Sequence, residues 1–139
     1  MPLWHIYCPK GAYSDSEKRQ FSDRISDAYV RFGMPRFYVS VIFQEVDQNS
    51  LYIGGEPAND FVRIWVHHIA RRLEPQHRGW WMKQVREIVT PFIEPRAFRW
   101  EAHVDETPIE LWTIQGLKPP PEGSDAEKRW VSENRPSIY

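Results

Sequence analysis

Hydrophobic and polar positions divide most of this chain into two successive strand–helix–strand units. Residues 3–8 are mostly apolar and predict a strand. Ser14 and Glu17 have the spacing of a capping box, which predicts that a helix begins there. Alternating residues at 36–46 predict a second strand beyond that helix. The apolar side of the helix is expected to consist of residues spaced four, three and four apart: Phe21, Ile25, Ala28 and Phe32.

The second unit repeats this order of elements with little similarity of sequence. Period-two alternation at 61–67 predicts a strand. Apolar spacing over 76–90 predicts a helix, which we expect Pro91 and Pro95 to end. Residues 97–104 then complete the unit as a strand.

These elements predict an α/β fold of the α+β type, with two fused β-α-β units in a single domain, 1–139. The first unit covers 2–47 and the second 60–105. Strands joined by helical crossovers run parallel, so we expect one four-stranded, mostly parallel-within-unit sheet with both helices on one face. The other face is left bare and apolar, and we expect an oligomer to cover it.

The C-terminal segment, 107–139, differs in composition from the two units. Its three consecutive prolines, 119–121, stop regular structure, and 125–133 predicts a short helix that carries Trp130. The segment is rich in apolar residues, so we expect it to pack as an arm. Two alternatives remain open: the arm wraps a neighbouring subunit, or it folds back on its own chain.

Composition narrows the classes of function. The chain has 18 Lys and Arg against 19 Asp and Glu, so its charge gives no attraction to nucleic acid or to a membrane surface. A single cysteine, Cys8, excludes an internal disulfide framework and fits a reducing compartment. No apolar run is long enough for a bilayer, and no signal-peptide pattern is present. We expect a cytoplasmic protein without a nucleic-acid or membrane partner.

Pro2 directly follows the initiator methionine and opens the first predicted strand. Removal of Met1 turns the proline ring nitrogen into a free secondary amine, which can accept and donate a proton. If Met1 remains, the same nitrogen is an amide without proton chemistry. A proline is also suited to start an edge strand for purely structural reasons, so both interpretations are open.

Other candidate side chains lie near the ends of predicted elements. Arg71 and Arg72 follow the third main strand, and a guanidinium can bind a carboxylate in two places at once. His103, on the last strand, titrates near neutral pH, and Tyr29 on the first helix could direct its hydroxyl into a pocket. The structural alternatives are a solvated arginine pair, a strand-end histidine and a half-buried tyrosine.

Neither a metal site nor a cofactor site is predicted. His67 and His68 are adjacent on a strand and point to opposite faces, so they cannot easily share an ion. The chain has no cysteine pair or His-Glu-x-x-His spacing, and Gly54-Gly55 lacks the spacing of a phosphate loop.

Several short motifs in order resemble the tautomerase superfamily, most of all the group around cis-3-chloroacrylic acid dehalogenase. The resemblance covers residues 2–120. It implies a homotrimer in which the sheets of three chains form a tautomerase-like barrel, with one site per chain around the terminal proline. The motifs that carry the resemblance are Pro2, Ser26-Asp27-Ala28-Tyr29, Phe43-Gln44-Glu45, Tyr52-Ile53-Gly54-Gly55, Ile64-Trp65-Val66-His67 and Glu106-Thr107-Pro108.

In dehalogenases of this group the proline is a general acid, two arginines bind the substrate carboxylate, and a histidine, a tyrosine and a glutamate help to activate water. The resemblance matches Pro2 to the proline and Arg71 to the first arginine, while the second arginine is missing. The histidine falls on Tyr29 and the tyrosine on His103. The water-activating glutamate falls on Ile114, which cannot do that chemistry.

These departures favour proton transfer over hydrolysis, because hydrolysis needs a base that positions water. We expect a tautomerase-type enzyme acting on a small unsaturated or 2-oxo carboxylic acid. Pro2 is its expected general base and acid, Arg71 and Arg72 bind the carboxylate, and His103 and Tyr29 orient the carbonyl or enol oxygen. The alternatives are a hydratase or dehalogenase of 3-haloacrylate-like acids, and a non-enzymatic trimeric binding protein.

Overall fold

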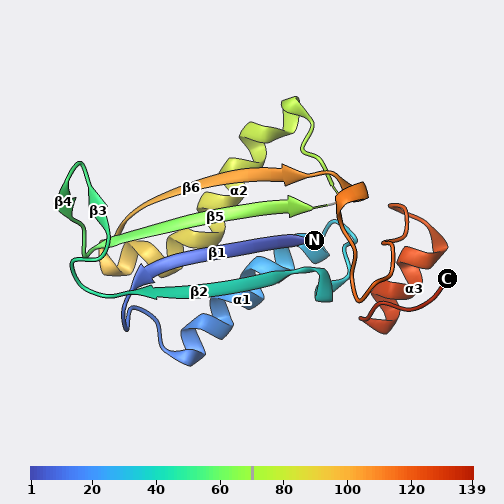
Figure 1. Cartoon of the computed structure of the whole chain (residues 1–139), viewed down its shortest axis with the longest axis horizontal. Coiled ribbons are helices and arrows are strands. Elements are labelled where there is room, and N and C mark those ends of the chain that lie inside the picture. Colours follow the sequence, from blue (N-terminus) through green and yellow to red (C-terminus); the bar gives the residue numbers. More distant parts are fainter. Residues whose placement is uncertain (70) are drawn as a thin grey trace.

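A four-stranded sheet forms one layer of the molecule, and two long helices cover one of its faces (Figure 1). The computed structural model describes residues 1–69 and 71–139. The strands of the sheet are β1 (Pro2–Pro9), β2 (Ser40–Val46), β5 (Phe61–Ile69) and β6 (Arg99–Thr107). The helices are α1 (Asp15–Val30), α2 (Pro75–Ile93) and α3 (Asp125–Glu133). A small hairpin of β3 (Tyr52–Ile53) and β4 (Glu56–Pro57) connects the two units.

The strand order, β2-β1-β5-β6, confirms the predicted pair of β-α-β units. β1 runs parallel to β2 and β5 runs parallel to β6, whereas β1 and β5 are antiparallel where the two units meet. Within the described part of one chain the sheet is open, with β2 and β6 at its edges. The barrel of three sheets therefore remains an expectation for an assembly of three chains.

Several predicted element boundaries were wrong: β6, predicted at 97–104, spans Arg99–Thr107, β5 runs two residues past the predicted 67, and two further differences have a visible cause. The second strand begins at Ser40 because a 3-10 turn occupies Arg36–Tyr38. α2 does not stop at Pro91 but continues to Ile93. Proline cannot donate to the carbonyl four residues earlier, at Glu87, and that oxygen accepts Arg24 Nη2 at 3.0 Å instead. A donor from α1 thus replaces the lost helical bond.

The core lies between the sheet and the two long helices. Alternate residues of β1 point toward the helices, and Trp4 and Ile6 are fully buried there against Phe21 and Ile25 of α1. Phe32 was predicted to belong to the apolar side of α1, and this was wrong. It follows the end of the helix, and its side chain is 48% exposed. The core also includes Cys8, Val62, Ile64, Val66, Trp81, Val85, Ile88 and Val89.

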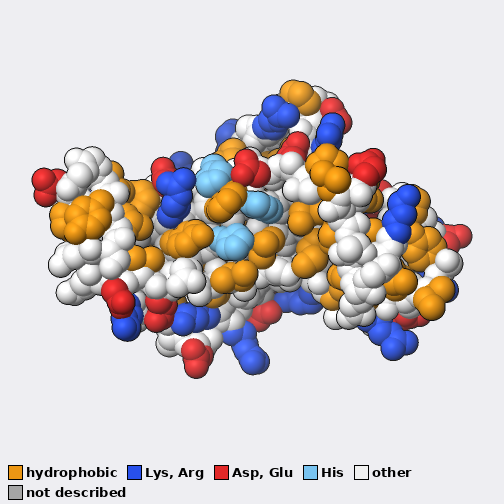
Figure 2. Space-filling view, in the orientation of Figure 1, with side chains coloured by type: hydrophobic (Ala, Val, Ile, Leu, Met, Phe, Trp, Pro, Cys, Tyr) orange, Lys and Arg blue, Asp and Glu red, His pale blue; other side chains and the backbone are white. Residues whose placement is uncertain are grey.

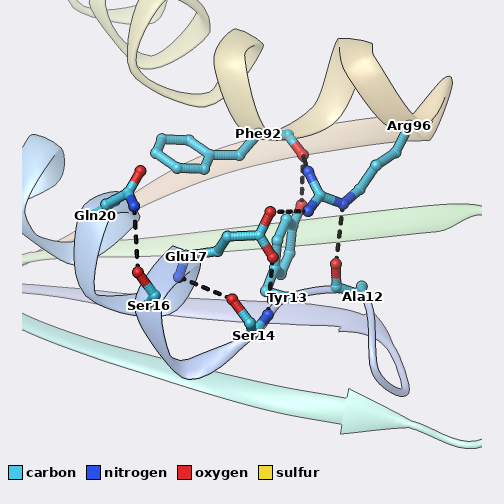
Figure 3. Close-up of polar contacts among 8 residues, drawn as sticks. All are labelled: Ala12, Tyr13, Ser14, Ser16, Glu17, Gln20, Phe92 and Arg96. Atoms are coloured by element: carbon cyan, nitrogen blue, oxygen red, sulfur yellow. Dashed lines mark hydrogen bonds and ion pairs between the residues drawn. The ribbon is translucent and has the colours of Figure 1, made fainter.

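Arg96 joins the two units at the far end of the helices (Figure 3). Its Nε donates to the Ala12 carbonyl at 2.9 Å and its Nη1 to the Phe92 carbonyl at 3.2 Å, and it pairs with Glu17. Glu17 also completes the predicted capping box with Ser14, which confirms the start of α1. One guanidinium therefore fixes the first turn of α1 against the last turn of α2.

None of the helices in the described part of the chain covers the second face of the sheet (Figures 1 and 2). Figure 2 shows histidine side chains gathered in the middle of this face among apolar ones. The ring of Trp65 lies 4.5 Å from that of His67 and 5.5 Å from that of His103, and His5 lies 6.1 Å from His67. This aromatic face is the one that we expect a trimer to cover.

The C-terminal arm packs on its own chain, which is the second of the two alternatives. Trp130 of α3 is fully buried, with its ring 5.9 Å from that of Phe37 and 6.2 Å from that of Tyr38. The backbone N–H of Phe37 donates to Asn134 Oδ1 at 3.0 Å. α3 spans Asp125–Glu133, as predicted. Among the described helices, none has both the length and the apolarity needed to cross a membrane.

Candidate functional site

The amino terminus lies at the end of the sheet where the chain leaves β5. Pro2 is fully buried and pairs with His68 across the two central strands. The amine of Met1 donates to the carbonyl of Ile69. Burial, and then the positive charge of Arg71, lower the pKa of this amine to about 5. The Met1 amine is therefore neutral near pH 7.

A cavity of about 580 Å³ opens beside this terminus, between the end of β5, the ends of the helices and the arm. Its position is set by the fold, because His68, the partner of Pro2, lines it. The loop after β5 contributes Arg71 and Arg72, and the arm contributes Glu122. One wall is apolar and consists of Phe32, Leu73, Trp80 and Trp81. The site thus combines guanidinium groups with an aromatic surface.

A buried chain of hydrogen bonds forms another part of the wall. Trp4 Nε1 donates to the Tyr29 hydroxyl at 2.9 Å, and that hydroxyl lies 2.8 Å from His68 Nε2. Because the tyrosine oxygen already accepts a hydrogen bond from Trp4, its hydroxyl can donate to His68 Nε2. Burial raises the pKa of Tyr29 and lowers the pKa of His68 to about 4, so both side chains are neutral at pH 7.

His68 is expected to make the folded state less stable in acid. Its pKa falls from 6.5 to about 4 on folding, so the unfolded chain takes up a proton more readily. The stabilisation is complete above pH 6.5 and is lost as the pH falls toward 4. Between pH 6.5 and pH 5 we expect a loss of about 2 kcal/mol in the free energy of unfolding.

Urea unfolding of the wild type at pH 7, 6 and 5 measures this loss. His68→Gln should show a flatter dependence on pH, whereas His77→Gln, which changes an exposed histidine, should keep the wild-type slope. Equal slopes for His68→Gln and the wild type would contradict the prediction.

Arg71 and Arg72 both line the cavity but differ in their surroundings. Arg71 Nη1 donates to the Phe32 carbonyl at 2.8 Å and Nη2 donates to Glu127 Oε1 at 3.0 Å. Its Nε lies 3.4 Å from Glu122 Oε1. Arg72 is exposed, and among residues 1–69 and 71–139 its side chain has no hydrogen-bond or ion-pair partner. Arg72 is therefore the guanidinium that is open to an incoming anion.

The structure places His103 away from this group within the chain. His103 pairs with Trp65 in register, whereas Pro2 pairs with His68, three positions further along β5. Its ring stacks on Trp65 on the sheet face without helices, where it lines a separate hollow. The fold thus brings Pro2, Tyr29 and the two arginines to one end of the molecule and leaves His103 on the opposite face of the sheet.

Comparison with known proteins identifies the family. A family model described as "Putative oxalocrotonate tautomerase enzyme" matches residues 1–135. The chain belongs to this tautomerase family. RhCC from Rhodococcus jostii RHA1 is 45% identical to this tautomerase-family chain, with 99% of each chain covered and a TM-score of 0.96. A protein described as a probable enzyme from Aspergillus fumigatus is 40% identical, with 100% and 98% covered and a TM-score of 0.93.

More distant structures share the tautomerase fold. N1, a member of the cis-3-chloroacrylic acid dehalogenase family, is 21% identical, with 95% of this chain and 97% of that chain covered and a TM-score of 0.76. A fused 4-OT wild-type asymmetric trimer is 19% identical, with 84% and 94% covered and a TM-score of 0.68. No curated protein matches the sequence. These structures confirm the fold expected from the resemblance.

The sequence alone did not single out two kinds of residue at this site of the tautomerase-family chain. His68 was considered only as a metal ligand, although the alternation of β5 places it on the same face as the buried Val62, Ile64 and Val66. Glu122 and Glu127 come from the distant arm, and no local pattern signals that they meet Arg71. In the described part of the chain, no three His, Cys, Asp or Glu side chains are grouped so as to hold a metal ion.

Proposed function

We propose that this chain is a tautomerase-type enzyme that transfers a proton between the enol and keto forms of a 2-oxo carboxylic acid. The observation that supports this most is the amino terminus, held beside a cavity that contains two arginines, in surroundings that lower the pKa of an amine. Removal of Met1 leaves the nitrogen of Pro2 as the terminal amine, at the strand position paired with His68. A neutral amine at pH 7 is a competent general base.

The proposed reaction moves one proton and needs no other reactant. The ring nitrogen of Pro2 takes the proton from the enol hydroxyl, and the electron pair of that bond forms the carbonyl. The carbon–carbon double bond then takes the same proton from the ring nitrogen at the adjacent carbon. The substrate is isomerised, and Pro2 returns to its neutral form.

The arginines and the buried hydrogen-bonded pair have separate roles in this proposal. Arg72 binds the substrate carboxylate, while burial and, to a smaller extent, the positive charge of Arg71 lower the pKa of a terminal amine in this place, as they do for Met1. Tyr29 fixes His68 at the cavity wall, and this neutral pair orients the substrate oxygen. His103 receives no role at this site, because it lies on the other face of the sheet.

Two measurements test the proposal together. Mass spectrometry of untagged protein from its own host should show a chain that begins at Pro2. The same protein should accelerate the loss of enol absorbance of phenylenolpyruvate over the rate in buffer. Protein with an extra residue before Pro2 serves as the control and should be inactive. Retention of Met1 in the host, or equal rates for the free and extended termini, would rule the mechanism out.

A further inference from the structure

The two carboxylates that contact Arg71 differ in how firmly they are held. Glu127 has a side chain that is only 8% exposed, and both of its oxygens are engaged. Oε1 accepts Arg71 Nη2 at 3.0 Å, and Oε2 accepts the backbone N–H of Gly123 at 2.7 Å. Removing one partner of such a buried pair leaves an uncompensated charge, so Glu127 is a permanent partner of Arg71.

Glu122, in contrast, is an exposed carboxylate that Arg71 holds only weakly. It lies 3.4 Å from Arg71 Nε, its side chain is 68% exposed, and it lines the cavity. Exposed ion pairs of this kind contribute little free energy, because water screens both charges. Glu122 is therefore held only weakly by Arg71, and its negative charge faces any anion that enters the cavity.

The pairing of charges at the cavity leaves one guanidinium for an incoming anion. Glu122 and Glu127 both contact Arg71, whereas Arg72 has no carboxylate partner among the described residues. One substrate carboxylate can therefore bind Arg72. A second carboxylate on the same substrate finds no unpaired guanidinium among the described residues that line the cavity, and it meets the negative charge of Glu122.

The apolar part of the cavity lining favours an apolar group. The rings of Phe32 and Trp80 meet edge to face at 5.5 Å, and Trp81 lies 6.1 Å from Trp80. Both Phe32 and Trp80 are more than two-fifths exposed, so apolar surface is available for a ligand. Aromatic surface of this kind gains free energy by burying an apolar or ring-shaped group and offers no partner to a carboxylate.

We propose that Glu122 is a specificity-determining residue, which makes the cavity select monocarboxylates with an apolar or aromatic tail and reject dicarboxylates. This selectivity deepens the proposed function and rests on it for the reaction, but it concerns binding and can be measured without catalysis.

Calorimetric titration with two unreactive acids tests the proposal. The probes are 3-phenylpropanoate, a monocarboxylate, and adipate, a dicarboxylate, each at low salt and at pH 8, where imidazole groups are neutral. The wild type should bind 3-phenylpropanoate more tightly. Glu122→Gln should tighten adipate about five- to tenfold and 3-phenylpropanoate less than about threefold, as expected for one exposed charge.

The matched control is Glu94→Gln, which removes the same charge from an exposed residue at the far end of α2. It should leave both affinities unchanged. Equal tightening of both acids in Glu122→Gln, no tightening of adipate, or no binding of either acid to the wild type would overturn the proposal.

Kinetics separate this proposal from the proposed reaction. If neither phenylenolpyruvate nor 2-hydroxymuconate is ketonised but the binding preference shifts as expected, the reaction is wrong and the selectivity holds. If the wild type ketonises phenylenolpyruvate and Glu122→Gln leaves the ratio of kcat/KM for the two substrates unchanged, the reaction holds and the selectivity is wrong.

Discussion

Replacing Pro2 with alanine is expected to lower kcat/KM for ketonisation of phenylenolpyruvate by about 100- to 10,000-fold, which is the usual contribution of a positioned general base. Alanine leaves a primary amine on a terminus that rotates freely, whereas the proline ring fixes its nitrogen at the start of β1. The fold should be unaffected, because proline contributes no N–H to the sheet at this position. Initial rates at several substrate concentrations measure the effect.

Pro9 offers a matched control at the other end of the same strand. Pro9→Ala replaces the same residue type at a peptide nitrogen that is not the terminal amine, so it should keep the wild-type kcat/KM. Thermal unfolding of both variants checks that the fold is intact. A Pro2→Ala enzyme with the wild-type rate would exclude the terminal amine from the reaction.

Replacing Trp130 with alanine is expected to produce the largest loss of stability, about 3–5 kcal/mol in the free energy that holds the arm in place. This side chain is fully buried between Phe37 and Tyr38, and its Nε1 donates to the Ser137 carbonyl at 2.8 Å. Its removal leaves a cavity and an unpaired carbonyl. The arm should then detach, and Arg71 should lose the carboxylate of Glu127.

Timed digestion with trypsin, together with thermal unfolding, measures this loss. We expect the variant to be cleaved at Lys128 and Arg129 while the wild type is still intact, and to unfold at a lower temperature. Trp80→Ala is the control, since Trp80 is 43% exposed and contributes less to stability. Identical digestion of Trp130→Ala and the wild type would show that the arm is not anchored by this residue.

The sequence predicted the elements well where local signals determine them. The capping box at Ser14 and the helix at Asp125–Glu133 depend on neighbouring residues, and both predictions were confirmed. The end of α2 was wrong because Pro91 is compensated by Arg24, a residue from another helix. No pattern within the helix contains that information.

At the candidate site too, the sequence indicated what local signals determine and missed contacts between distant residues. Pro2 was proposed because it follows Met1 and opens a strand, and Arg71 because it follows the end of another; strand order brings these two places together. His103 was selected for its chemistry and its place on the last strand, without regard to the face on which its side chain points. Glu127 meets Arg71 across 56 positions of sequence, and only the folded arm shows that contact.

Arg24 and Arg96 form hydrogen bonds between the two units, and these bonds make the folding of each unit depend on the other. Each arginine starts in one unit and binds backbone oxygens of the other: Arg24 at Glu87, and Arg96 at Ala12. A fragment that contains one unit alone leaves the central edge of its half-sheet open and its bridging guanidinium without the acceptor from the other unit. The halves are therefore obligate folding partners, and a chain split at the β3–β4 hairpin should recover its shape only when both pieces are present.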